Sequence, residues 1–211
     1  MRVKETSVYS FDELSDRAKE SAREWYRQST AEDFASFSAD SILDDASRIA
    51  ALFGLNISTR PVKLMNGSTR YDPNVFWAVS SRDSGASFAG DYSYQKGSVQ
   101  AVKAECPQDI ELHRIVQTLA NAQRQNFYKL QARISHGRSD WRLDIEVERS
   151  DDRYTNLANG TEAGVKDALT DFANWIRAQL EAEFEYLTSD TQVEESIRIN
   201  DYEFTAEGKR A

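Results

Sequence analysis

The sequence has little cysteine, histidine or proline, and it has no long apolar run. Its 211 residues include one Cys, two His and three Pro. A single Cys excludes an internal disulfide framework, and two His leave few ligands for a metal site. No run of about 18 apolar residues occurs, and the N-terminal segment has no apolar signal-peptide core. We therefore expect a cytoplasmic protein with no membrane partner and no cofactor.

The familiar catalytic motifs are also absent. The chain has no Walker A loop, no glycine-rich dinucleotide fingerprint, no HExxH and no GxSxG. Each of these motifs is required by a mechanism, so their absence favours a non-enzymatic protein. An enzyme with an unfamiliar site stays open as an alternative.

Acidic residues outnumber basic ones. Lys and Arg total 26 and Asp and Glu total 35, which gives a net charge of −9. Such a chain lacks the basic footprint of a general nucleic-acid binder, so we expect no direct nucleic-acid partner. Residues 161–211 alone hold twelve acids and five bases. This segment is either a solvated helix face or an acidic surface that docks a basic protein.

Periodicity and capping patterns predict the order of the elements. Helices are expected over about 11–26, 40–53, 162–187 and 190–200, with another that begins at Pro107 and Asp109. Whether residues 30–38 extend the second helix stays open. Strands are expected over about 56–64, 75–80, 87–94, 130–134, 141–147 and 202–205. Gly90 inside a strand indicates a bulge or a close backbone approach.

This order predicts an α+β fold. We expect a single antiparallel sheet of about 4–6 strands built from hairpins, with about five helices packed mainly on one face. No linker divides the chain, so one domain over 1–211 is expected, with a frayed tail at about 206–211. The apolar face of the 162–187 helix is wide enough to bury against the sheet or against a second copy, so a homodimer is among the expected assemblies.

Three acids alternate along one predicted strand. Asp144, Glu146 and Glu148 share a face, where they could bind Mg²⁺ or act as an acid–base set. The apolar alternates already supply a core face, so a solvated acidic face opposite Arg133 is the competing interpretation.

Cys106 precedes a predicted helix start, where a thiol pKa can be lowered. A catalytic Cys also needs a His base within reach. His113 lies about two helical turns away and His136 lies in a predicted turn, so an inert thiol is favoured.

Aromatic residues gather in the first predicted hairpin, among them Phe76, Trp77, Phe88, Tyr92 and Tyr94. They form either sheet core or a platform that stacks a base or anchors a protein. The residues expected to line a surface are Trp77, Arg82, Asp83, Tyr92 and Tyr94.

Four blocks of sequence carry a resemblance. They are VYSFDELSDRAKESAREWY at 8–26, SGASFAGDYSY at 84–94, ELHRIVQTLANAQRQNFYKLQARISH at 111–136 and LEAEFEYLTSDTQVEESIRINDYEFTAEGKR at 180–210. In this order they resemble a family of proteins from phages and prophages, many of which carry the label "antitoxin of toxin–antitoxin stability system". The resemblance implies an accessory protein that acts on host machinery, and it brings no catalytic residues. The 75–88 segment departs from the relatives' pattern at the tip of the first hairpin.

Three functions follow as hypotheses. The first is a non-enzymatic phage-type protein that binds and neutralises a bacterial protein, an immune effector or a toxin. Its expected contacts are Glu181, Glu183, Glu185, Glu194, Glu195, Trp25, Tyr26 and Tyr186. The second is a protein that sequesters a nucleotide-like ligand through the aromatic hairpin, with Arg82, Arg114, Arg124 and Arg133 in the mildly basic middle of the chain. The third is a metal-dependent enzyme that uses Asp144, Glu146 and Glu148.

Overall fold

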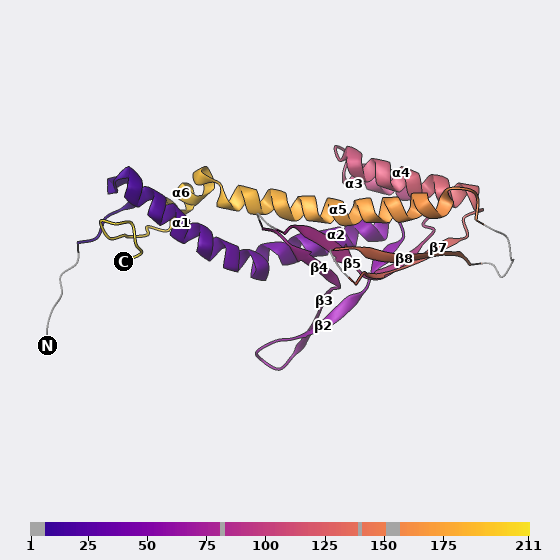
Figure 1. Ribbon diagram of the computed structural model, residues 1–211, viewed down its shortest axis with the longest axis horizontal. Coiled ribbons are helices and arrows are strands. Elements are labelled where there is room, and N and C mark those ends of the chain that lie inside the picture. The colour runs from indigo at the N-terminus through magenta and orange to yellow at the C-terminus, as the bar shows by residue number, and fades with distance from the viewer. Residues whose placement is uncertain (1–6, 81–82, 139–140, 151–156) are drawn as a thin grey trace. The chain divides into compact units, whose positions relative to one another are not determined.

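The computed structural model describes residues 7–80, 83–138, 141–150 and 157–211 (Figure 1). By its internal contacts the chain divides into two compact units. Unit 1 consists of Met1–Ala39 and Glu181–Ala211, and unit 2 consists of Asp40–Leu180. Each unit is described separately below.

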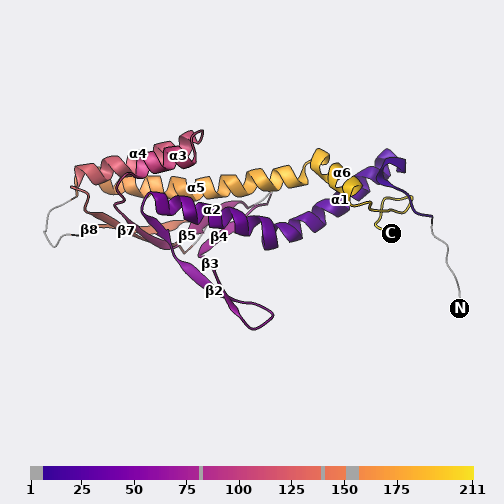
Figure 2. The same cartoon turned by 180° about the vertical axis from the view of Figure 1, so that it is seen from behind.

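Unit 2 contains a four-stranded antiparallel sheet and two short ribbons. The sheet has the order β1-β6-β7-β8, and the ribbons pair β2 with β3 and β4 with β5. The strands are β1 Leu55–Ile57, β2 Thr59–Lys63, β3 Thr69–Pro73, β4 Val75–Ala78, β5 Gly85–Phe88, β6 Gly90–Ser93, β7 Leu130–His136 and β8 Leu143–Arg149. Figure 2 shows the β2–β3 ribbon projecting away from the rest of this unit.

Four helices complete unit 2, and three of them, α3, α4 and α5, lie on the same side of the sheet (Figure 1). They are α2 Ala39–Leu52, α3 Ser98–Glu105, α4 Ile110–Gln125 and the first part of α5 Thr161–Thr188. Asp109 caps α4 through its side chain, which accepts a hydrogen bond from the Leu112 amide at 2.9 Å. The apolar stripe of α4 is buried, as the 3.6-residue period predicts. It consists of Leu112, Ile115, Val116, Leu119 and Ala122.

The core of unit 2 forms where α5 meets the sheet. The Phe172 ring lies edge-on to Phe53 and Phe88 at centroid distances of 5.1 and 5.9 Å. All three side chains are at most 2% exposed. Gly90 lets β6 approach β1, because a Cβ at this position would lie 2.3 Å from the Asn56 carbonyl oxygen. The predicted close approach at Gly90 is therefore confirmed.

Unit 1 joins the two ends of the chain. It holds the turn η1 Phe11–Glu13, the helix α1 Asp16–Asp33, the π-helical turn η2 Phe34–Ser38, the last turns of α5 and the helix α6 Asp190–Ile199. Its buried core consists of Phe11, Leu14, Ala18, Ala22, Val193, Ile197 and Phe204. Phe204 exchanges both backbone hydrogen bonds with Tyr9. The tail after it is also bonded, since the Ala211 amide donates to the Glu203 carbonyl.

The α+β class and the antiparallel pairing are confirmed, whereas the single sheet and the bounds of two predicted strands are wrong. The described strands form one sheet and two ribbons instead of a single sheet. The strand expected over 56–64 breaks at Ser58 into β1 and β2, and the one expected over 87–94 breaks at Ala89 into β5 and β6. The six α-helices of the described chain include α3, which no prediction anticipated.

The helix starts differ in one place. The capping box at Ser10 exists, with the Glu13 carboxylate accepting from the Ser10 amide at 2.8 Å, but it closes only the turn η1. Ser15 is the N-cap of α1. In the part of the chain that the structure describes, no helix combines the length and the apolar character needed to cross a membrane.

Candidate functional site

Unit 2 carries a hollow of about 300 Å³ between the β4–β5 ribbon and the turn that joins β7 to β8. It adjoins a shallower hollow of about 370 Å³, and the two share Phe76 and Trp141. We call the two together the aromatic hollow. Its lining residues are Arg60, Val75, Phe76, Trp77, Asp83, Ser87, His136, Gly137, Arg138, Trp141 and Arg142.

Stacked rings form one wall of the aromatic hollow. The Phe76 and His136 rings are parallel within 10° at a centroid distance of 3.9 Å. The Arg60 guanidinium carbon lies 5.8 Å from the Phe76 ring centroid, within the range of a cation–π contact. Phe76 is still 44% exposed, so part of its surface remains accessible to a ligand.

Trp141 lines both parts of the aromatic hollow and is held by two contacts. Its indole Nε1 donates to Asp83 Oδ1 at 2.8 Å. Its ring packs on Gly85 so closely that a Cβ there would lie 2.1 Å from Trp141 Cγ. Trp141 has a φ of 57°, a left-handed conformation that costs an L-residue about 1–2 kcal/mol. The sequence alternation placed Trp141 on a strand, but β8 begins only at Leu143.

His136 is bonded through both ring nitrogens. Nδ1 lies 2.9 Å from Ser87 Oγ, and Nε2 lies 3.2 Å from Asn74 Oδ1. Asn74 Nδ2 donates to Ser58 Oγ, so its carbonyl oxygen is the atom that faces the imidazole. Nε2 must therefore carry the ring proton, and Nδ1 accepts from the Ser87 hydroxyl.

Burial lowers the pKa of His136 from its ordinary value of 6.5, and the positive charge of Arg60 lowers this pKa further. The imidazole is therefore neutral at neutral pH. The positive charge of the aromatic hollow comes from its arginines.

Three arginines line the aromatic hollow, namely Arg60, Arg138 and Arg142. Among the described residues, no carboxylate lies within ion-pair distance of Arg60, Arg138 or Arg142. Elsewhere arginines are commonly paired, as at Arg23, Arg27, Arg48, Arg70, Arg114 and Arg198. With Asp83 as the one acid in its described lining, the aromatic hollow is cationic. Guanidinium groups beside aromatic planes suit a planar anion.

The structure separates the residues predicted to line a ligand surface. Trp77 and Asp83 lie in the aromatic hollow. Tyr92 is only 3% exposed, and burial raises its pKa to about 12. Tyr94 lies beyond the end of β6 and pairs with Tyr128 at a centroid distance of 4.6 Å. Arg82 lies outside the described residues.

The other predicted arginines are elsewhere. Arg114 bonds Glu111 and Asp171, and hydrogen bonds from these two carboxylates raise its pKa. Arg124 lines a small hollow beside Tyr94. Arg133 lies opposite Glu146 in the register of β7 and β8.

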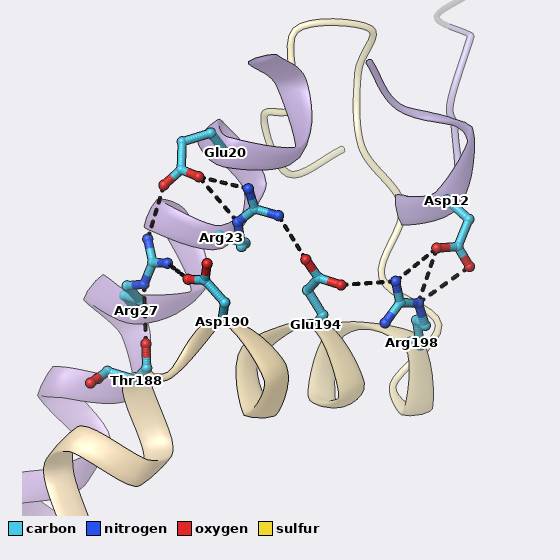
Figure 3. Close-up of polar contacts among 8 residues, drawn as sticks. All are labelled: Asp12, Glu20, Arg23, Arg27, Thr188, Asp190, Glu194 and Arg198. Carbon is cyan, nitrogen blue, oxygen red and sulfur yellow. Dashed lines mark hydrogen bonds and ion pairs between the residues drawn. The ribbon is translucent and has the colours of Figure 1, made fainter. Parts of the chain in front are cut away.

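Unit 1 holds most of the net charge. It has seventeen acids and nine bases, a net charge of −8, whereas unit 2 has a net charge of −1. An ion-pair network uses part of this charge internally (Figure 3). Glu194 bonds Arg23 at 2.7 Å and Arg198 at 3.0 Å, so this predicted docking residue joins α6 to α1.

The network extends to both sides of Glu194. Arg198 bonds Asp12 at 2.9 Å, and Arg27 bonds Glu20 at 3.1 Å as well as Asp190 (Figure 3). The Arg198–Asp12 and Arg27–Asp190 pairs hold together segments that are far apart in the sequence.

The remaining residues predicted to contact a partner differ in exposure. Trp25 and Tyr26 pack against the core of unit 1, and Trp25 lies edge-on to Tyr202 at 5.3 Å. Glu185, Glu195 and Tyr186 are exposed, Tyr186 by 56%. Glu181 and Glu183 are half-buried on α5.

The three alternating acids of β8 face solvent. Asp144, Glu146 and Glu148 are exposed and lie opposite Ser135, Arg133 and Gln131. Across the residues that the structure describes, no three His, Cys, Asp or Glu side chains gather in a way that could hold a metal ion.

Cys106 is the C-cap of α3 rather than the N-terminus of a helix. Burial raises the pKa of its thiol, and the negative charges of Asp109 and Glu105 raise it further. His113 Nε2 bonds the Cys106 carbonyl oxygen at 2.8 Å. The arrangement is that of a capped helix end with a protonated thiol.

Sequence reasoning missed most of the aromatic hollow, namely Arg60, Phe76 as a surface residue, His136, Arg138, Trp141 and Arg142. The available signal was local: His136, Gly137, Arg138, Trp141 and Arg142 surround one turn, which combines aromatic, basic and titratable side chains. Their approach to β4 depends on the pairing of distant strands.

Comparison with known families assigns the chain to one of them. A model described as a domain of unknown function, DUF8835, matches residues 38–190. The chain belongs to this family. The match includes every described residue of the aromatic hollow. No curated protein matches the chain, and no solved structure does.

Proposed function

We propose that this protein is a binding protein whose aromatic hollow takes a planar, negatively charged small molecule of the nucleotide type. The observation that carries the proposal is the grouping of Arg60, Arg138 and Arg142 beside the exposed Phe76 ring and the half-buried Trp77 and Trp141 rings. Arginine forks match phosphate oxygens, and aromatic faces stack bases. The volume of the hollow suits part of such a molecule, with the remainder in solvent.

A thermal-shift screen with cyclic and linear nucleotides tests this proposal. A ligand that binds only the folded state stabilises it by about 2.7 kcal/mol at a hundred times its Kd, or a midpoint rise of roughly 5–10 °C. Arg142→Gln should reduce the shift. Arg133→Gln is the matched control, because Arg133 lies on the exposed face of β7. No shift with any nucleotide would refute the proposal.

A second candidate function rests on unit 1. Its net charge of −8 is carried by only 70 residues, and Glu185, Glu195 and Tyr186 are exposed there. Such a surface suits a basic bacterial protein, such as the immune effector or toxin that a phage-type accessory protein would neutralise.

Charge reversal tests this second function. Glu185→Lys and Glu195→Lys should slow association with a captured partner and reduce its salt sensitivity, as surface plasmon resonance would measure. Glu194→Lys is unsuitable, because it would break the internal pairs with Arg23 and Arg198. Unchanged association kinetics in both variants would contradict an acidic docking face.

A further inference from the structure

A serine, a histidine and an asparagine form one hydrogen-bonded chain at the aromatic hollow. Ser87 comes from β5, His136 from the end of β7 and Asn74 from the link between β3 and β4. Ser87 Oγ lies 2.9 Å from His136 Nδ1, and His136 Nε2 lies 3.2 Å from Asn74 Oδ1. This is the order of a nucleophile, its base and a group that orients the base.

The direction of the hydrogen bonds fits this order. Because Nε2 donates to Asn74, Nδ1 has a free lone pair that accepts the Ser87 proton. The backbone of Asn74 is itself fixed, since its backbone N–H donates to the Ser58 carbonyl oxygen at 2.7 Å. The neutral imidazole described above is the form that acts as a base.

Ser87 also has access to the aromatic hollow. Its residue surface is only 3% exposed, yet it is part of the lining together with Arg138 and Arg142. Guanidinium groups stabilise the negative oxygens of a phosphoryl group in transfer. A nucleophile and such groups therefore border the same space.

We infer that Ser87 is the nucleophile of a phosphoryl-transfer reaction in the aromatic hollow, with His136 as its base and Asn74 as a positioning residue. The inference rests on the proposed function, since its substrate class is a phosphate monoester of a nucleotide-like molecule. The overall reaction is hydrolysis of this ester to an alcohol and inorganic phosphate.

The reaction has two balanced steps. In the first, Ser87 Oγ forms a bond to phosphorus and the bond from phosphorus to the ester oxygen breaks. The Ser87 proton passes to His136 Nδ1 and then to the leaving oxygen. In the second, water attacks phosphorus, its proton passes to His136 Nδ1 and the Oγ–phosphorus bond breaks. Oγ then takes that proton, so the residues return to their starting state.

A fluorophosphonate probe tests for the nucleophile. Attack by Ser87 Oγ expels fluoride and leaves a covalent adduct, which peptide mass spectrometry locates. We expect an adduct on Ser87 that is lost in Ser87→Ala and forms about 100-fold more slowly in His136→Gln. Ser135→Ala is the matched control, since Ser135 is the exposed neighbour of His136. No adduct on Ser87, or an equal rate in His136→Gln, would overturn the inference.

Two further measurements separate folding and binding from catalysis. Ser87→Cys keeps a nucleophile at this position, so its alkylation by iodoacetamide should be slower when His136 is also replaced by Gln. Unfolding midpoints show whether each variant folds. For the hydrolysis of p-nitrophenyl phosphate, kcat should be lost in Ser87→Ala. The control Ser135→Ala should show little change in KM. A nucleotide thermal shift without any adduct refutes the catalytic inference alone. An adduct without any nucleotide shift refutes the ligand class of the proposed function.

Discussion

The buried amide of Gln123 replaces a missing strand partner at the start of β7. Its Nε2 donates to the Leu130 carbonyl at 2.9 Å, and its Oε1 accepts from the Leu130 amide at 3.1 Å. β6 pairs with β7 only as far as Gln131, so Leu130 has no partner on that side of the described sheet. Gln123 is 1% exposed and Leu130 is also 1% exposed, which leaves no water to take over these bonds.

Gln123→Leu should therefore be strongly destabilising. Two buried backbone groups would be left unsatisfied at about 1–3 kcal/mol each, so the free energy of unfolding should fall by about 2–6 kcal/mol. Equilibrium urea unfolding, followed by tryptophan fluorescence, measures this loss. Gln117→Leu is the matched control on the same helix, because Gln117 is exposed and its side chain donates to the Asn121 side chain instead of a buried backbone group. Its effect should stay within about 0.5 kcal/mol.

A loss below about 1 kcal/mol for Gln123→Leu would refute this reasoning. It would mean that the Leu130 amide and carbonyl find other partners, and that the side chain of Gln123 does not complete the ladder of β7.

Three further predictions concern pH, backbone strain and charge. Because the pKa of His136 is lower in the folded protein, the unfolded chain takes up the imidazole proton at a higher pH than the folded chain does. The contribution of His136 to the free energy of unfolding is therefore present above pH 6.5 and is lost as the pH falls below 6.5. In His136→Gln, the free energy of unfolding should depend less on pH below 6.5. Phe127 has a φ of 55° and is 74% exposed, so Phe127→Gly should raise the free energy of unfolding by about 0.5–1 kcal/mol in urea titrations, and a loss would contradict the strain. Glu194→Gln should cost about 1 kcal/mol at low salt and less at 1 M salt, where screening weakens the pairs with Arg23 and Arg198, whereas a salt-independent loss would point to packing.

Local periodicity predicted the elements whose patterns are strong. The stripe of α4, the hairpin of β7 and β8 and the cap of α6 at Ser189 follow from residues within a few positions of one another. The two ribbons could not be predicted from local periodicity. Ser58 and Ala89 interrupt two segments whose patterns are those of continuous strands. What breaks them is a hydrogen bond between the Ser58 amide and the Ala89 carbonyl, a contact between distant parts of the chain.

The candidate site was predictable only in part. Trp77 and Asp83 were named from the hairpin composition, and both lie in the aromatic hollow. Tyr92 and Tyr94 are two residues apart, so a continuous strand would place them on the same face. Because β6 ends at Ser93, Tyr94 leaves the face that Tyr92 occupies. The contribution of His136 depends on the approach of β7 to β5, which no local pattern encodes. In contrast, the Glu194–Arg198 pair has the i, i+4 spacing that a sequence reveals.

The most direct test of the aromatic hollow uses the four tryptophans as reporters. In a nitrogen-15 NMR titration with the nucleotide that gives the largest thermal shift, the indole N–H signals of Trp77 and Trp141 should move. Those of Trp25, in unit 1, and Trp175, whose indole bonds Asp109 at 2.7 Å, should stay in place. If no indole signal moves, or if only those of Trp25 and Trp175 do, the aromatic hollow is not the ligand site.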